Sequence, residues 1–407
     1  MADRAMTADT AVTPAAPWRR IVLAVLLAVL LIPVVKNGLA LALADRNSRL
    51  ALKIDDGSSA AQAQEALRVA QADLSPRARQ RVRALASAAV LDDPTNAGAL
   101  TALGLATEDV RRARRVMAAS DQLSRRSLLA QLWLIEDAVQ RGDITGALDH
   151  YDIAMRVSRQ ALSILFPVLV SATSDDDLLP YIARTLARRP AWGLQYQLQL
   201  AQSGADLPNI ATLFEALLRR RIDPGDAALG VLFQRLADTQ NYERAWQLYT
   251  LLRPGQPRTG VRNGNFARQP NDPVVFDWRL SDNQVDLATS IDRLAGGDRL
   301  SFSAGSGAGG TAARQLLLLR PGSHVLRATA FDTQATGAQR PTLRVLCAIT
   351  GAELGNFPLP QAGENGTRGA WRFAVPAGCS AQWLEIIVPP AESFEPNTGA
   401  VSGISIV

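Results

Sequence analysis

The chain has 407 residues, which gives room for about two or three domains, and 47% of its residues are hydrophobic, enough to bury sizeable cores. Its formal net charge is +5, but Lys36 and Lys53 are the only lysines, and the arginines alternate with acids along the expected helices. Charges spread in this way over solvated helix faces do not make a phosphate-binding surface. We therefore expect no nucleic-acid partner.

The first marked feature is the apolar run 21–35, which directly follows Arg19 and Arg20. A membrane-spanning helix needs ~20 mostly apolar residues, and the run reaches that length when it is extended through 38–44. We therefore predict a single transmembrane anchor over 21–44.

The basic residues directly before the run favour a cytoplasmic tail over 1–20, because basic flanks tend to stay inside. The body is then expected in the periplasm of a bacterium, held at the inner membrane by one pass with the N-terminus inside. A cleaved signal peptide ending at 42–44 is the alternative, because small residues there fit the cleavage pattern. Both alternatives carry the body across the membrane.

The segment 45–254 has a helical pattern. Apolar residues recur at three- and four-residue spacings, and the breaks carry Pro, Gly, Asp and Asn. The pattern predicts helices that pair into hairpins, among them helices over 127–140, 145–160, 226–239 and 242–252.

Small and aromatic residues repeat in kind between these hairpins: Ala147 and Tyr151 in one correspond to Ala245 and Tyr249 in another. A small residue lets the second helix approach the first closely, and the aromatic residue one turn later fills the gap to the next hairpin. The residues expected to pack in this way are Leu103, Gly104, Leu134, Ala147, Tyr151, Ala154, Ala245 and Tyr249.

On these residues, and on the corner formed by 93–96, the segment resembles the tetratricopeptide repeat family. The resemblance implies an α-solenoid of TPR-like helical hairpins whose concave face binds proteins or peptides and carries no catalysis. The stretch 161–224 departs most from the family pattern. An irregular helical bundle without a groove is the alternative.

The character of the chain changes at 255–262, where proline and glycine indicate a linker. Beyond it, 263–407 holds about eight or nine short strand-like runs separated by Gly, Pro, Asn and Asp, a pattern typical of an antiparallel sandwich. In one run, 342–349, alternate apolar residues share a face.

The opening Asn263–Phe266, the tryptophan of 276–278 and the closing 403–407 resemble carbohydrate-binding-module jelly rolls. The resemblance implies a module that binds glycans or serves a structural or protein-binding role. The predicted fold is therefore multidomain: a single N-terminal transmembrane helix, an α-solenoid, and then an all-β jelly-roll sandwich.

Glycan binding needs exposed aromatic faces that stack on pyranose rings. Trp278 and Trp371 alternate with apolar neighbours and are expected in the core. Trp383 and Phe357 remain as candidate glycan contacts, and packing inside the sandwich is the alternative for each.

The chain contains two cysteines, Cys347 and Cys379, which either pair in an oxidising compartment or stay as two buried thiols. Its two histidines, His150 and His324, lie in different segments, and no zinc spacing, nucleophile motif or phosphate loop occurs. We therefore expect no catalytic residue, no cofactor, no metal and no enzymatic activity.

Together these features predict a non-catalytic, inner-membrane-anchored periplasmic scaffold in exopolysaccharide or cell-envelope assembly or export. Its helical groove is expected to bind partner proteins, and polysaccharide is a second expected partner. The alternatives are a glycan-binding module displayed on a helical stalk and a cryptic carbohydrate-active enzyme.

Overall fold

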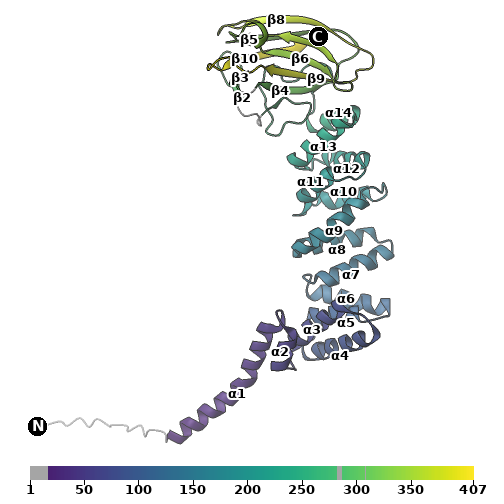
Figure 1. The fold of residues 1–407 in the computed structure, drawn as a ribbon. Coiled ribbons are helices and arrows are strands. Elements are labelled where there is room, and N and C mark those ends of the chain that lie inside the picture. The colour runs from purple at the N-terminus through teal and green to yellow at the C-terminus, as the bar shows by residue number, and fades with distance from the viewer. Residues whose placement is uncertain (1–16, 282–286, 308) are drawn as a thin grey trace, which may run out of the picture. The chain divides into compact units, whose positions relative to one another are not determined.

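The computed structural model describes residues 17–281, 287–307 and 309–407, and in these it has helices followed by two β-sheets (Figure 1). The predicted order, with a helical region first and an all-β part last, is confirmed. The chain divides into two compact units, Met1–Leu165 and Phe166–Val407. The predicted domain boundaries at residues 44, 254 and 262 stay predictions, and most of the predicted tail 1–20 lies outside the described residues.

The first unit is helical. Its helices are α1 (Pro17–Ala44), α2 (Ser48–Ile54), α3 (Ser59–Ala72), α4 (Pro76–Asp92), α5 (Ala97–Leu105), α6 (Val110–Leu123), α7 (Leu128–Gln140) and α8 (Ile144–Val157), and α9 (Arg159–Ala172) runs across the division between the units.

Among the residues that the structure describes, no helix combines the length and the apolar character needed to cross a membrane. The predicted transmembrane anchor over 21–44 is therefore wrong, and so is the single-pass inner-membrane localisation with a periplasmic body. The predicted span needed 38–44 to reach sufficient length, and this end of α1 packs on protein instead. Ala40 and Ala44 are buried against alanines of α2 and α3.

Helices α3 and α4, α5 and α6, and α7 and α8 pair as hairpins. Polar side chains define where several of them begin, because Asn96, Asp109 and Ser127 each accept a hydrogen bond from a backbone N–H in the first turn. Gly104 lies close to the second helix of its hairpin. A Cβ there would lie 2.8 Å from Cε of buried Met117 on α6.

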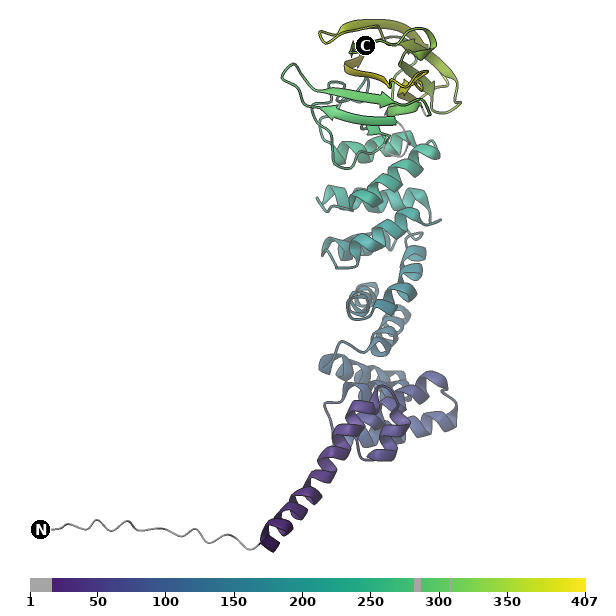
Figure 2. The ribbon, with the colours of Figure 1, turned by 60° about the vertical axis from the view of Figure 1, so that its left-hand side comes forward.

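The helices that lie wholly in the second unit are α10 (Leu179–Ala187), α11 (Gly193–Gln202), α12 (Leu207–Arg219), α13 (Asp226–Asp238) and α14 (Tyr242–Leu252). They pack in alternation, α10 on α12, α11 on α13 and α12 on α14. In Figure 1, α14 lies next to β4 and β9, and the turned view in Figure 2 keeps this teal helix against the sandwich.

The sandwich consists of two five-stranded antiparallel sheets, in the orders β1-β4-β9-β6-β7 and β2-β3-β10-β5-β8. The strands are β1 (Arg279–Leu280), β2 (Leu287–Asp292), β3 (Arg299–Ala304), β4 (Gly310–Leu317), β5 (Gly322–Phe331), β6 (Thr342–Cys347), β7 (Glu353–Pro358), β8 (Thr367–Val375), β9 (Gln382–Val388) and β10 (Asn397–Ile406). One apolar core lies between the sheets, and the alternation in β6 places Leu343, Val345 and Cys347 in it.

The glycine of the opening segment is required by a close approach of two backbones. The carbonyl of Gly264 accepts a hydrogen bond from the Ile404 N–H in β10, with 2.9 Å between nitrogen and oxygen. A Cβ on Gly264 would collide with the Ile404 carbonyl oxygen. The start of the sandwich is thereby held against its last strand.

Candidate functional site

The structure does not bring the two predicted glycan contacts together. Trp383 is on β9 and pairs with Leu346, whereas Phe357 is on β7 and pairs with Leu343, so the register places the two rings on opposite faces of one sheet. The guanidinium of Arg314 lies 4.8 Å from the centre of the Trp383 ring. The role of Trp383 in binding stays a prediction.

Phe357 lies at the edge of the sandwich core. Its ring stacks on Trp371 of β8, with 5.9 Å between ring centres, and it packs against the buried cluster between the sheets. This position favours the packing alternative for Phe357.

Of the residues expected to pack in the helical repeats, Leu103 is partly buried and the others are buried: Gly104, Leu134, Ala147, Tyr151, Ala154, Ala245 and Tyr249. Their repeat role stays a prediction.

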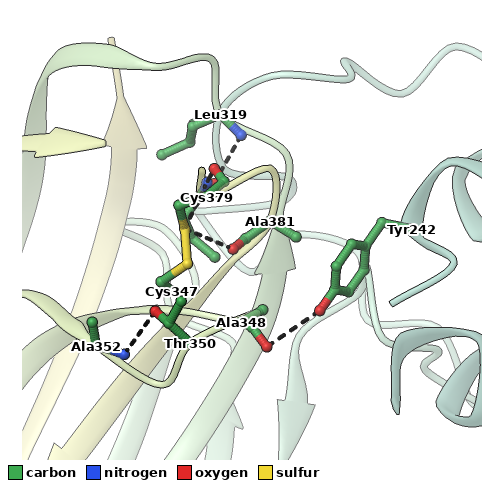
Figure 3. Close-up of a disulfide and its surroundings, with 9 residues drawn as sticks. Tyr242, Leu319, Cys347, Ala348, Thr350, Ala352, Cys379 and Ala381 are labelled. Atoms are coloured by element: carbon green, nitrogen blue, oxygen red, sulfur yellow. Dashed lines mark hydrogen bonds between the residues drawn. A yellow bond between two sulfur atoms is a disulfide. The ribbon is translucent and has the colours of Figure 1, made fainter. Parts of the chain in front are cut away.

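Cys347 and Cys379 form a disulfide in this structure, with 5.7 Å between their Cα atoms (Figure 3). The bridge joins the end of β6 to the loop before β9, where the Gln382 amide donates a hydrogen bond to the Cys379 carbonyl at 2.7 Å. Tyr242 of α14 donates to the carbonyl of Ala348, directly after Cys347, at 3.3 Å. This corner of the sandwich is thus linked to the last helix.

The two histidines lie in separate parts of the fold. Nδ1 of His150 on α8 is 2.8 Å from Oε1 of Gln131, and burial lowers the pKa of this imidazole. His324 on β5 lies with Nε2 2.8 Å from the carbonyl of Arg320. Over the described ranges there is no group of three or more His, Cys, Asp or Glu residues that could hold a metal ion.

A polar cavity of about 420 Å³ lies at one end of the sandwich, between segment 334–339 after β5 and segment 391–398, which leads into β10. We call it the loop cavity. Two amide side chains connect its walls. The Asn397 amide nitrogen donates to the carbonyls of Gln339 and Pro389 at 2.8 and 3.0 Å, and the Gln339 amide nitrogen donates to the Glu392 carboxylate at 2.6 Å.

These hydrogen bonds use the two amide nitrogens and leave the two amide oxygens free. Oδ1 of Asn397 and Oε1 of Gln339 are both buried, and neither has a hydrogen-bond partner within the described structure. Asn397 as a whole is only 8% exposed. An unpaired buried acceptor costs about 1–3 kcal/mol, so each of these two oxygens is stabilised when a hydrogen-bond donor reaches it.

The same loop carries Phe394, whose relative exposure is 107%, the largest of any aromatic residue with a described side chain. Its chain neighbours Ser393 and Glu395 line the loop cavity, as does Glu392. Phe394 itself is not among the lining residues, but it belongs to the segment that forms one wall of the cavity, beside the two glutamates. This arrangement suits a ligand with an apolar face and several hydroxyl groups.

Phe394 is not among the glycan contacts predicted from the sequence. The signal that could have found it is local: the ring lies between two prolines, Pro390 and Pro396, in a segment without the alternation of a strand. A large aromatic in such a loop has no core position to fill. Gln339 and Asn397 carry no comparable signal, because their unpaired amide oxygens depend on contacts across the fold.

No family model matches the chain, and no curated protein sequence matches it. Solved structures that resemble part of it include the enzymatically active domain of tailspike protein 4 of bacteriophage CBA120, at 18% identity and a TM-score of 0.27 over 37% of this chain and 21% of that one. The chain therefore spans about a fifth of that tailspike domain.

Two carbohydrate-binding modules also resemble the chain. One is a CBM4 module, at 9% identity and a TM-score of 0.27 over 36% of this chain and 97% of the module. The other is the CBM22-1 xylan-binding domain of Paenibacillus barcinonensis Xyn10C, at 6% identity and a TM-score of 0.22 over 32% of this chain and 83% of that domain.

Proposed function

We propose that the chain is a non-catalytic carbohydrate-binding protein and that the loop cavity is its glycan site. The observation that carries this proposal is the pair of buried, unpartnered oxygens of Gln339 and Asn397 on the two sides of a cavity, one wall of which carries the exposed Phe394. The proposal corresponds to the glycan-binding alternative of the sequence analysis, with a different set of contact residues.

Sugar chemistry fits the cavity in two ways. Each hydroxyl of a pyranose can donate a hydrogen bond, so two neighbouring hydroxyls would satisfy the free oxygens of Gln339 and Asn397. The carbon face of the same ring can stack on Phe394, as apolar ring faces do on aromatic side chains. Glu392 and Glu395 add charged acceptors, which make stronger hydrogen bonds than neutral ones.

Affinity electrophoresis of the full chain through gels that contain β-glucan, xylan or galactomannan tests the proposal. At least one polysaccharide should retard the protein, and Phe394→Ala should weaken that retention about tenfold, because it removes the stacking surface. Glu395→Gln should weaken it less. Leu294→Ala is the matched control, since it removes another exposed apolar side chain from the same sandwich.

Three outcomes would overturn the proposal. Retention unchanged in Phe394→Ala would place the glycan elsewhere. Release of reducing ends from the retained polysaccharide would show an enzyme. Loss of retention on chelation, with a bound divalent ion in the purified protein, would show that the free oxygens serve a cation.

We also propose that the helical region binds a protein partner. Exposed apolar side chains near the ends of three helices support this second proposal: Leu91 on α4, Leu123 on α6 and Val139 on α7. Leu91→Glu and Val139→Glu should abolish co-purification of a partner and leave polysaccharide retention unchanged. Co-purification that survives both changes contradicts it. The role in exopolysaccharide assembly or export stays a prediction.

A further inference from the structure

A second cavity, of about 460 Å³, lies within the second unit where the end of α14 meets the segment that enters the sandwich. We call it the junction cavity. Its size is within the range of small-molecule sites, about 300–1,000 Å³. Unlike the loop cavity, it is lined by arginines: Arg253, Arg262 and Arg268.

Arg262 is the central cation of this region, and it is only 2% exposed. Its Nε donates to the Phe276 carbonyl at 2.9 Å, another of its guanidinium nitrogens donates to the Leu316 carbonyl, and its charge lies 5.5 Å from the ring centre of Trp246. Burial lowers its pKa to about 10, so it remains charged at neutral pH. Among the described residues no carboxylate forms an ion pair with it.

The acid that lines the junction cavity is Asp277, and its carboxylate is already engaged. One oxygen accepts from the Tyr249 hydroxyl at 2.7 Å and the other from the Val274 N–H at 3.1 Å. Three arginines and one aspartate therefore line the cavity. The charge of Asp277 acts on Arg262 and favours its charged form, but it leaves two of the three arginine charges without a lining carboxylate. An anionic group bound in the cavity would compensate this excess of positive charge.

Two residues of the lining each carry a buried polar atom without a hydrogen-bond partner among the described residues. Trp278 and Gln269 both line the cavity. Nε1 of Trp278, a residue that is 1% exposed, and Oε1 of Gln269 are buried without hydrogen-bond partners in the described structure. The Gln269 amide nitrogen is fixed by donating to the Trp278 carbonyl at 3.0 Å. One atom can only donate and the other only accept, and a hydroxyl group can satisfy both at once.

We propose that the junction cavity binds an acidic sugar, a uronic-acid unit, with its carboxylate at the arginines and a ring hydroxyl at Trp278 and Gln269. The free donor of Trp278 and the free acceptor of Gln269 favour a hydroxyl, and the excess of lining arginines over carboxylates favours an anion. This site is separate from the loop cavity and does not depend on glycan binding there.

Calorimetric titration of the full chain with glucuronate, glucose and inorganic phosphate tests the proposal. Glucuronate should bind about tenfold more tightly than glucose, because only glucuronate brings a charge-assisted contact to the arginines. It should also bind more tightly than phosphate, which has no sugar ring, and it should raise the melting temperature. Similar affinity for all three, or no binding and no rise in melting temperature, would overturn the proposal.

Variants locate the site. Arg253→Gln and Arg268→Gln should each weaken glucuronate binding several-fold, about as expected for the loss of one charge-assisted contact. Arg372→Gln, which removes an exposed arginine of β8 away from the lining, is the matched control and should leave binding unchanged. Phe394→Ala should also leave it unchanged, which separates this site from the loop cavity. Equal losses in Arg268→Gln and Arg372→Gln would contradict the assignment.

Discussion

Tyr249, on α14, donates its hydroxyl hydrogen to Oδ1 of Asp277, in the segment that leads into the sandwich, with 2.7 Å between the two oxygens. The Tyr249 ring also lies against Phe276, with 5.2 Å between ring centres. A hydrogen bond to a charged acceptor and an aromatic contact therefore join the last helix to the start of the sandwich at one point.

Tyr249→Phe is expected to lower the free energy of unfolding by about 2 kcal/mol, because it removes a half-buried hydrogen bond to a carboxylate and keeps the ring. Urea denaturation at neutral pH measures the loss. Tyr242→Phe is the matched control. Its hydroxyl donates to the neutral carbonyl of Ala348 at 3.3 Å, so its loss should be about 1 kcal/mol or less. Equal losses in the two variants would contradict this ranking.

The same tyrosine should make stability depend on alkaline pH. Burial, and then the charge of Asp277, raise the pKa of Tyr249 above its ordinary value of 10.0. The folded protein therefore keeps the phenolic proton at a pH where the unfolded chain loses it. This contribution is complete below pH 10 and is lost as pH rises above it. Thermal melts between pH 9 and 11.5 measure this effect. The melting temperature should fall less with rising pH for Tyr249→Phe than for the natural chain.

Gly264→Ala should destabilise the sandwich by about 2–3 kcal/mol, because its Cβ would collide with the Ile404 carbonyl oxygen, which belongs to backbone and cannot rotate away. Gly378→Ala is the matched control, since a Cβ there would meet no atom within 4 Å. Thermal unfolding followed by tryptophan fluorescence compares the two. A Gly264→Ala protein as stable as Gly378→Ala would show that the two backbones can separate without cost.

Hydrophobic periodicity predicts the helices and strands in which apolar residues recur at regular spacing. The helix expected over 242–252 is α14 with the same ends, and the strand run from 342 has its alternate residues in the core. The prediction for α1 is wrong because apolar content alone does not show what a helix packs against. Ala40 and Ala44 continue the apolar run, yet they are buried on neighbouring helices.

The candidate sites were harder to predict from the sequence because they depend on contacts between distant residues. Arg262 lies in a stretch whose prolines and glycines indicate a linker, and only its contacts with Phe276 and Leu316 show that it is buried. The amide nitrogen of Asn397 is held by the carbonyl of Gln339, 58 residues away in the chain, and this leaves the amide oxygen of Asn397 without a partner in the described structure. Neither the composition of the chain nor the spacing of its residues indicates the burial of Arg262 or the unpaired oxygen of Asn397.

Reduction of the Cys347–Cys379 bridge should lower the free energy of unfolding by about 4 kcal/mol, because the bridge closes a loop of 32 residues and limits the freedom of the unfolded chain. Melts with and without a phosphine reductant measure this change. The double variant Cys347→Ala, Cys379→Ala is the control, and its melting temperature should not respond to reductant. An unchanged melting temperature for the reduced natural chain would contradict the expected contribution.

Glu65 is expected to control the acid stability of the first unit. Its carboxylate, 0% exposed on α3, accepts from Nε and Nη2 of Arg68 at 2.7 and 2.6 Å, from the Ser48 hydroxyl at 2.8 Å and from Arg81 at 3.1 Å. These contacts join α2, α3 and α4. The hydrogen bonds from Arg68 lower the pKa of Glu65 by more than desolvation raises it. The pKa therefore falls from 4.5 to about 2.

Because the folded-state pKa of Glu65 is depressed, its contribution is complete above pH 4.5 and is lost as pH falls toward about 2. The expected size is about 2 kcal/mol, less than the full shift implies, because the partner arginines are partly exposed to solvent. Helical circular dichroism melts between pH 6 and 2 measure it. Glu65→Gln should be less stable than the natural chain at neutral pH and should lose less stability as pH falls. Glu353 is an exposed glutamate on β7, and the control variant Glu353→Gln should have the same pH dependence as the natural chain. If Glu65→Gln and the natural chain lose equal stability on acidification, the acid sensitivity lies with other carboxylates.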